Sequence, residues 1–196
     1  MSSVPQLSML ERSARIVDGT DAAPIGLKVT AEAAPVEEVA SGIGVIESFS
    51  NVVVFNTDDG LTLFDVSHGM AAKSSVASLR SWSQDKVNTA VYTHGHTDHV
   101  GGAGAFNADA TDRGHQAINF VAHEAVIDRF DRYKLTNGYN GYINMRQFRL
   151  PGPMFPSDFV YPDTTFRSET TLNIGGRSFE LHHARGETDD HTWAWV

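Results

Sequence analysis

The chain has 196 residues, of which 41% are hydrophobic and 20% charged, and its formal net charge is −9. This length suits one domain with a core of its own, and the composition is that of an ordinary globular protein, which excludes disorder throughout the chain. The acidic balance argues against nucleic-acid binding, which needs basic patches against phosphate, and the lack of cysteine excludes disulfides and thiolate metal sites.

Residues 1–35 are expected to form an N-terminal arm, and residues 36–196 a single domain. The first segment is rich in Ser, Ala, Pro and Asp and shows little periodicity, so it either packs on the domain or a partner or is partly disordered. Its beginning lacks the apolar run of a signal peptide, and no stretch approaches the roughly 20 apolar residues of a membrane span. A cytoplasmic location is therefore the default expectation.

Three apolar, β-branched runs between residues 36 and 67 are separated by Gly, Ser, Asn and Asp, which predicts a meander of antiparallel strands. Asp58-Asp59-Gly60 predicts a hairpin turn within it. Residues 71–82 follow with Val76, Leu79 and Trp82 at helical spacing.

A short apolar strand is predicted at residues 87–93, and it ends in the polar loop HGHTDHVGG, which leads into a turn of small residues. Residues 118–133 predict a strand followed by a helix, and residues 134–168 are expected to be irregular. The final segment predicts strand, Gly175-Gly176 turn, strand, loop and strand. Strands and helices that alternate after a meander indicate a layered α/β or α+β domain with a mixed sheet.

Four residues in the polar loop are candidate metal ligands: His94, His96, Asp98 and His99. Imidazole nitrogens and carboxylate oxygens are good ligands for zinc and similar dications. His94 and His96 are two residues apart in extended chain at a strand end, so they point to the same side and can bind one metal together. Asp98 and His99 follow after the chain turns and can serve a second metal.

This loop resembles the HxHxDH signature of the metallo-β-lactamase superfamily, and the resemblance covers roughly residues 40–196. It implies the N-terminal portion of an αββα sandwich with a mixed β-sheet. It also implies that His94 and His96 bind the first metal and that Asp98 and His99 bind the second. The run LTLFDVS resembles the family strand that ends in a supporting aspartate, which implies that Asp65 lies near the metal loop.

Gly186-Glu187-Thr188 stands where the superfamily usually has Gly-His-Thr, so the resemblance implies Glu187 as the third ligand of the first site. A glutamate there is similar to the alkylsulfatase branch. This implies a hydrolase of sulfate esters with one or two zinc ions per chain, iron or manganese being alternatives. Water activated by the metal would be the nucleophile, and Asp98 would be catalytic by orienting it or accepting its proton.

Other functions stay open on these residues. They are hydrolysis of lactones, thioesters or phosphodiesters, redox chemistry on non-haem iron, and a truncated metal-binding subunit that is inactive or depends on a partner. The family normally has a bridging carboxylate and another histidine after the strand at Trp193–Val196, where this chain ends. The domain is therefore expected to be incomplete at its C-terminus, with a homodimer or a complementing C-terminal segment as alternatives.

The remaining histidines differ in the roles expected of them. His191 lies four residues after Glu187, where it would either replace that ligand or support it, and His68 would support the metal loop. His182 and His183 are expected to have structural or supporting roles, and His115 and His123 to have no catalytic role.

Residues 134–168 are expected to contribute a substrate pocket for a small, amphiphilic ester. Five side chains would make its apolar wall: Tyr139, Tyr142, Phe148, Met154 and Phe155. Arg146 and Arg149 would pair with an anionic head group. The alternative is a surface loop that packs its own aromatic side chains.

Overall fold

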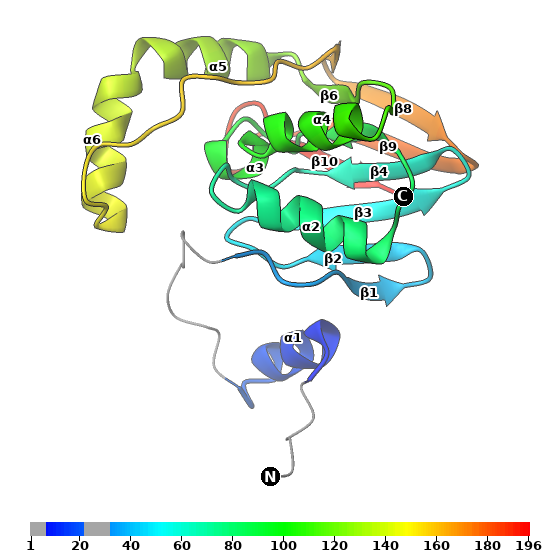
Figure 1. Ribbon diagram of the computed structural model, residues 1–196. Coiled ribbons are helices and arrows are strands. Elements are labelled where there is room, and N and C mark those ends of the chain that lie inside the picture. Colours follow the sequence, from blue (N-terminus) through cyan, green and yellow to red (C-terminus); the bar gives the residue numbers. More distant parts are fainter. Residues whose placement is uncertain (1–6, 22–31) are drawn as a thin grey trace.

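The computed structural model describes residues 7–21 and 32–196 of the chain (Figure 1). Seven strands form a large sheet: β1 (Glu37–Ala40), β2 (Ile43–Ile46), β3 (Val52–Thr57), β4 (Gly60–Phe64), β5 (Val87–Val91), β6 (Asn119–His123) and β7 (Thr164–Phe166). They lie in chain order, antiparallel from β1 to β4 and parallel from β4 to β7. The mixed sheet predicted from the sequence is therefore confirmed.

The antiparallel half is the predicted meander, and glycines shape two of its turns, between β1 and β2 and between β3 and β4. The run at residues 36–47 folds into two strands because Gly42, with a φ of 70°, reverses the chain between β1 and β2. The predicted turn at Asp58-Asp59 joins β3 to β4 and ends at Gly60, whose φ is 110°. A Cβ atom at Gly60 would lie 2.5 Å from the carbonyl oxygen of Lys86, so this position also needs a residue without a side chain.

Helices make the crossovers that the parallel strands require. They are α2 (Ala72–Trp82) between β4 and β5, α3 (Thr97–Val100) and α4 (Ala103–Asp112) between β5 and β6, and α5 (Ala125–Leu135) and α6 (Asn137–Phe148) between β6 and β7. α2 and α4 lie on one face of the sheet, where Leu79 and Phe106 are buried in the larger core cluster (Figure 1). This layer fixes the loops at the carboxyl ends of β4 and β5.

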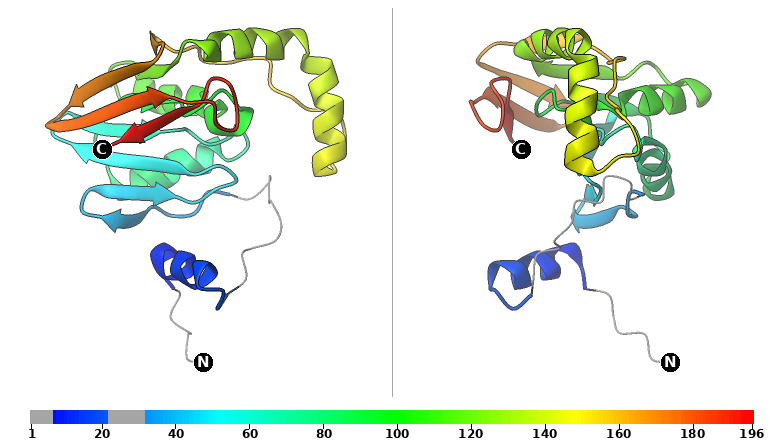
Figure 2. Two further views of the ribbon diagram at one scale, coloured as in Figure 1. Left: turned by 180° about the vertical axis from the view of Figure 1, so that it is seen from behind. Right: turned by 90° about the vertical axis from the view of Figure 1, so that its left-hand side faces the viewer.

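A smaller antiparallel sheet covers the other face (Figure 2). It contains β8 (Glu169–Ile174), β9 (Arg177–His183) and β10 (Thr192–Trp195), with β9 in the centre. The predicted turn at Gly175-Gly176 joins β8 to β9 with φ values of 48° and 80°. Phe179 of β9 is fully buried, and its ring lies 5.3 Å from that of Phe55 in the large sheet. Helices, large sheet and small sheet are three successive layers.

The segment after the histidine-rich loop differs from the expected turn, because residues 103–112 form the helix α4. Its alanines favour a helix, and Ala103, Phe106 and Ala110 share the face that is buried against the core. The spacing of these three residues is a helical signal that small side chains make easy to miss.

The expectation of irregular structure throughout residues 134–168 is wrong for α6 and for β7. Gly138 and Gly141 lower the intrinsic helix propensity of α6, so its stability comes from tertiary contacts. The side-chain amide of Asn137 donates to the carbonyl oxygens of Phe155 and Pro156, both at 2.9 Å. A Cβ atom at Gly141 would lie 3.3 Å from Pro153, so the glycine lets the following segment pass close to the helix.

The described part of the N-terminal arm contains a helix, α1 (Met9–Val17). Ser8 and Glu11 form a capping box at its start, a signal that is readable in the sequence. Arg12 pairs with Glu47 at 2.7 Å, which attaches the helix beside the first hairpin. Within residues 7–21 and 32–196, no helix has the length and apolar character needed to cross a bilayer.

Candidate metal centre

The candidate ligands lie where β4 and β5 end and where the loop between β9 and β10 returns to the large sheet. β4 is buried along its whole length and is followed by Asp65, and β5 is followed by Thr93 and His94. The amide of Thr192, at the start of β10, donates to the carbonyl oxygen of Thr93 at 2.7 Å. This bond holds the second loop against the first, at the sheet edge where parallel strands commonly present ligands.

His94, His96 and Glu187 form a compact cluster, with one ligand atom from each lying within 4.8 Å of the others. Nε2 of His94 lies 3.7 Å from one carboxylate oxygen of Glu187, and Nδ1 of His96 lies 3.4 Å from the other. These separations are too long for hydrogen bonds between the groups. Separations of this size are expected between atoms that bind the same metal ion.

The environment of His94 supports that interpretation. Its side chain is 2% exposed, and Nδ1 lies 3.0 Å from the hydroxyl of Thr93, which leaves Nε2 facing Glu187. That buried Nε2 has no hydrogen-bond partner in the described part of the chain. Buried polar atoms are normally paired, so a nitrogen aimed at a carboxylate without a bond to it fits a metal ligand. The Glu187 side chain is 62% exposed, which leaves the cluster accessible from solvent.

His191 supports Glu187 and lies outside this cluster. Its Nδ1 accepts a hydrogen bond from the amide of Glu187 at 3.1 Å, and its ring stacks on that of His94 at 5.0 Å. A Cβ atom at Gly186 would lie 2.4 Å from the same nitrogen, so the histidine packs directly on the loop backbone. Of the two roles expected for His191, the contacts favour support over ligation.

Asp98 and His99 lie on the short helix α3, beside the first cluster. Nε2 of His99 is 3.4 Å from a carboxylate oxygen of Asp98, and the ring centres of His94 and His99 are 4.1 Å apart. In the described residues, no third histidine or carboxylate joins these two in a group as compact as the first. The proposed second site therefore has two candidate ligands in place.

Asp65 lies beneath α3, close to the metal loop, as the resemblance implies. One oxygen lies 2.6 Å from Nδ1 of His99 and accepts from the Thr93 hydroxyl at 2.8 Å, while the other accepts from the Thr93 amide at 2.7 Å. The carboxylate therefore turns Nε2 of His99 toward Asp98. The backbone of Asp65 has a φ of 59°, a left-handed conformation that aspartate tolerates better than most residues.

Burial is the main cause that determines the protonation state of His94 and His96. Burial and the neighbouring His99 and His96 lower the pKa of His94 to about 4, and burial also lowers the pKa of His96. For His99, burial lowers the pKa, but the hydrogen bond to Asp65 and nearby carboxylates outweigh it, so the net pKa is raised. His94 and His96 are therefore neutral near pH 7, the form in which imidazole binds a metal.

The metal-free protein is expected to lose stability as the pH falls from about 6.5 toward about 4. In this window the unfolded chain protonates His94 and the folded chain does not, so acid favours unfolding, by up to about 3 kcal/mol. His99 has the opposite sign, because its raised pKa contributes stability below 6.5 that is lost as the pH rises through its folded value.

Urea unfolding of the metal-free chain at several pH values measures this slope. His94→Gln, which does not titrate, should flatten it between pH 6.5 and 4. An unchanged slope in that variant would show that another group controls acid stability.

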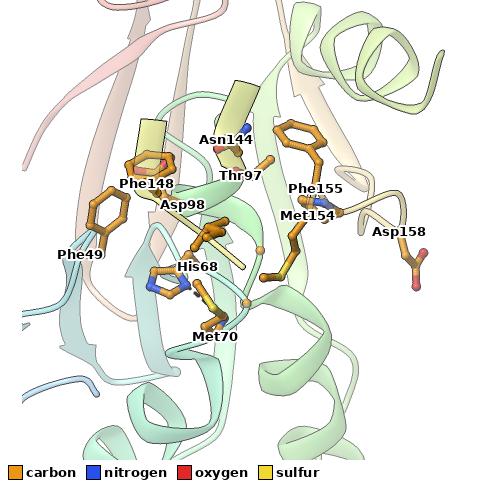
Figure 3. A pocket seen from close by; sticks show the side chains of 14 residues that line it. Phe49, His68, Met70, Thr97, Asp98, Asn144, Phe148, Met154, Phe155 and Asp158 are labelled. Atoms are coloured by element: carbon orange, nitrogen blue, oxygen red, sulfur yellow. Dashed lines mark hydrogen bonds between the residues drawn. The ribbon is translucent and has the colours of Figure 1, made fainter. Parts of the chain in front are cut away.

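A cavity of about 380 Å³ lies beside the metal loop and is lined by Thr97 and Asp98 of α3 (Figure 3). Its wall is mainly apolar and includes these side chains: Phe49, Met70, Phe148, Met154 and Phe155. Within residues 7–21 and 32–196, no lysine or arginine is among the residues that line it. The ring of Phe148 packs edge-on against Phe49 at 5.8 Å, so α6 closes one side of the cavity.

Three of the five residues expected in the pocket wall line this cavity: Phe148, Met154 and Phe155. Tyr139 and Tyr142 do not, because they lie on the outer side of α6 and are 71% and 60% exposed. Arg146 and Arg149 are also not among the residues that line this cavity, and their expected pairing with an anionic head group stays a prediction. His68 lines the cavity and packs edge-on against Phe49.

The remaining histidines lie in other contacts. His123 and His183 stack on each other with ring centres 3.8 Å apart, and His182 stacks on Trp193 at 4.3 Å. Sequence reasoning missed three residues that contact the metal-loop backbone or its ligands: Thr93, Arg129 and Asp190. Asp190 lies within the motif that contains Glu187, but nothing in the sequence around Arg129 indicates its position.

Residues 45–195 match the family model of the metallo-beta-lactamase superfamily. No curated protein sequence matches the chain. The similar solved structures include the sec-alkylsulfatase Pisa1 from Pseudomonas sp., with a TM-score of 0.67, 17% identity, and coverage of 83% of this chain and 29% of that one.

Two metallo-β-lactamase structures are also similar. One, from Cronobacter sakazakii and described by its HARLDQ motif, has a TM-score of 0.63, 15% identity, and coverage of 85% of this chain and 59% of that one. The other, GOB-18 from Elizabethkingia meningoseptica, has a TM-score of 0.61, 20% identity, and coverage of 84% and 56%. The chain spans less than two thirds of the length of each structure, and at these identities the similarity shows the fold.

Proposed function

Because the chain belongs to the metallo-β-lactamase superfamily, we propose that it is a metal-dependent hydrolase whose first metal site consists of His94, His96 and Glu187. The observation that carries this proposal is the convergence of their ligand atoms within 4.8 Å around a buried imidazole nitrogen. Two imidazoles and a carboxylate, with no thiolate, are a donor set of catalytic zinc sites, in which a further position stays open for water or substrate.

We further propose sulfate esters with an apolar organic group as the substrate class. Three observations support this choice: the acidic third ligand Glu187, the similarity to a structure described as a sec-alkylsulfatase, and the apolar cavity beside Asp98. Since no lysine or arginine of the described part of the chain lines the cavity, it suits the apolar part of a substrate, and the sulfate would face the metal cluster.

The roles of the side chains follow from their positions. A bound dication supplies Lewis acidity and lowers the pKa of water to about 7, which provides a nucleophile at neutral pH. Asp98 lines the cavity and lies beside His99, and in the proposed role its carboxylate orients the attacking water and accepts its proton. Asp65 keeps His99 oriented toward Asp98, and the apolar wall holds the organic group and excludes water from it.

Elemental analysis of the purified full chain and a substrate panel test this function. We expect zinc at one or two ions per chain, and hydrolysis of secondary alkyl sulfates in preference to nitrophenyl carboxylates, lactones, thioesters, phosphodiesters and β-lactams. A zinc content near one ion per chain would indicate that Asp98 and His99 do not complete a second site. Full metal loading with cleavage of β-lactams or lactones only would overturn the sulfate assignment and leave the metal centre intact.

Shortening the cavity wall should weaken the binding of long alkyl chains. Phe148→Ala removes an aromatic surface that faces the cavity, and we expect KM for a long-chain substrate to rise about tenfold, with little change for a short one. Steady-state kinetics over a series of chain lengths measures this. Tyr139→Ala is the matched control, because it removes an exposed aromatic ring from the same helix outside the cavity. Equal effects of the two variants would contradict the assignment of the cavity.

A further inference from the structure

The buried carboxylate of Asp190 joins the two loops that contain the candidate ligands and forms an ion pair with Arg129. Nε of Arg129, on α5, donates to Oδ2 of Asp190 at 2.8 Å, and the amide of Gly95 donates to the same oxygen at 3.0 Å. Gly95 lies between His94 and His96, and Asp190 lies three residues after Glu187. One carboxylate therefore contacts both ligand-containing segments.

The second oxygen of the Asp190 carboxylate is also hydrogen-bonded. Asp190 is completely buried, and its second oxygen accepts from the hydroxyl of Thr188, the residue next to Glu187. Arg129 makes a second ion pair with the exposed Asp189 in the same loop. α5 is thus fixed to the loop between β9 and β10 by two adjacent carboxylates.

The pair also packs directly on the backbone of the metal loop. A Cβ atom at Gly95 would lie 2.7 Å from Cδ of Arg129 and 2.9 Å from Oδ2 of Asp190. Any change in these two side chains therefore changes the support of the peptide that links His94 to His96. Neither Arg129 nor Asp190 belongs to the ligand cluster, and both contact the backbone that links two of its ligands.

A buried ion pair is weak evidence for stability, because desolvation offsets much of the attraction between its charges. The contribution of this pair is to fix the relative position of the two ligand-containing loops, because its hydrogen bonds run in fixed directions to both of them. His94 and Glu187 come from segments far apart in the sequence, and the distance between them determines how well they bind one ion. Partners that orient metal ligands typically change metal affinity by about 10-fold to 100-fold when removed.

We propose that Asp190 and Arg129 are positioning residues that hold Glu187 in register with His94 and His96 and thereby determine the metal affinity of the cluster. This inference rests on the proposed metal site. It assigns a role to a residue on α5, which contributes no ligand to the cluster.

The test is the zinc dissociation constant of the metal-free full chain, measured at neutral pH by competition with a chromophoric chelator. We expect Asp190→Asn to weaken zinc binding by about 10-fold to 100-fold. Arg129→Lys retains the positive charge but loses the directed Nε bond, and it should also weaken binding. Circular dichroism and thermal unfolding check that both variants are folded, and Arg129→Lys carries the test if Asp190→Asn does not fold.

The Arg80–Asp109 pair provides a matched control. It is a similarly buried pair with a 2.6 Å contact between α2 and α4, and neither residue belongs to the cluster. Asp109→Asn should lower the melting temperature and leave the zinc affinity of the folded chain unchanged. If folded Asp190→Asn or Arg129→Lys binds zinc as tightly as the unaltered chain, or if Asp109→Asn weakens binding equally, the positioning role is wrong. If the unaltered chain binds no zinc, the proposed metal site fails, and this inference with it.

Discussion

Replacing His94 by alanine is expected to abolish zinc binding at the first site and to lower kcat/KM for hydrolysis by about a thousandfold, equivalent to about 4 kcal/mol. His94 is the most buried of the three candidate ligands, and its Nε2 is held toward Glu187 by the contact of Nδ1 with Thr93. Alanine removes that nitrogen, so the ion would keep only His96 and Glu187, one of which is exposed to solvent. Elemental analysis and steady-state kinetics of the purified variant measure both effects.

His115→Ala is the control for this substitution. His115 lies just after α4, and its amide donates to the carbonyl oxygen of Ala110 in an ordinary helix-end contact that alanine preserves. We expect unchanged zinc content and activity. Retention of stoichiometric zinc and full activity in folded His94→Ala would remove the basis for the metal site.

Replacing Asp65 by alanine is expected to destabilise the protein by about 3 kcal/mol and to reduce metal binding by Asp98 and His99. Asp65 is 5% exposed and accepts hydrogen bonds from both the amide and the hydroxyl of Thr93. Alanine would leave those buried donors unpaired and release His99 from its fixed orientation. Urea unfolding of the metal-free chain and zinc titration of the folded chain measure the two effects separately.

Asp65→Asn separates the role in packing from the role toward His99. Asparagine retains an acceptor for Thr93, so we expect a loss of about 1 kcal/mol, but its neutral amide is a weaker acceptor for Nδ1 of His99. Metal binding by Asp98 and His99 should therefore decrease in both variants, whereas the large loss of stability occurs only in Asp65→Ala. If Asp65→Ala has normal stability and normal zinc stoichiometry, Asp65 does not support the metal loop.

The strands, their turns and the metal loop are predictable because their signals are local. A β-branched run, a glycine pair such as Gly175-Gly176, or the close spacing of His94, His96, Asp98 and His99 has its physical meaning within a few residues. The helix α4 is partly readable in the same way, since Ala103, Phe106 and Ala110 recur on one helical face.

α6 illustrates the limit of such signals. Two glycines and several asparagines disfavour a helix, and the segment becomes helical because Asn137 and Gly141 contact the chain that returns beside it. The composition of this stretch correctly indicates an apolar wall, but which aromatic side chains face the cavity depends on the face that α6 turns inward. Tyr139 and Phe148 belong to the same helix, and only Phe148 lines the cavity.

By itself the sequence indicated a layered fold with a mixed sheet, most of the strands and their turns, and the loop with four candidate ligands, because hydrophobic periodicity, turn chemistry and ligand spacing act over short distances along the chain. The family resemblance implied Glu187 as the third ligand, and the tertiary structure brings it to His94 and His96. Only the tertiary structure decided that His191 supports Glu187 and that Asp190 bonds to Gly95 across 95 residues of sequence. The physical reason is that these contacts depend on the positions that the β9–β10 loop and α5 take when the two sheets and their helices pack. Local propensities do not encode the distance between segments that are so far apart in the sequence.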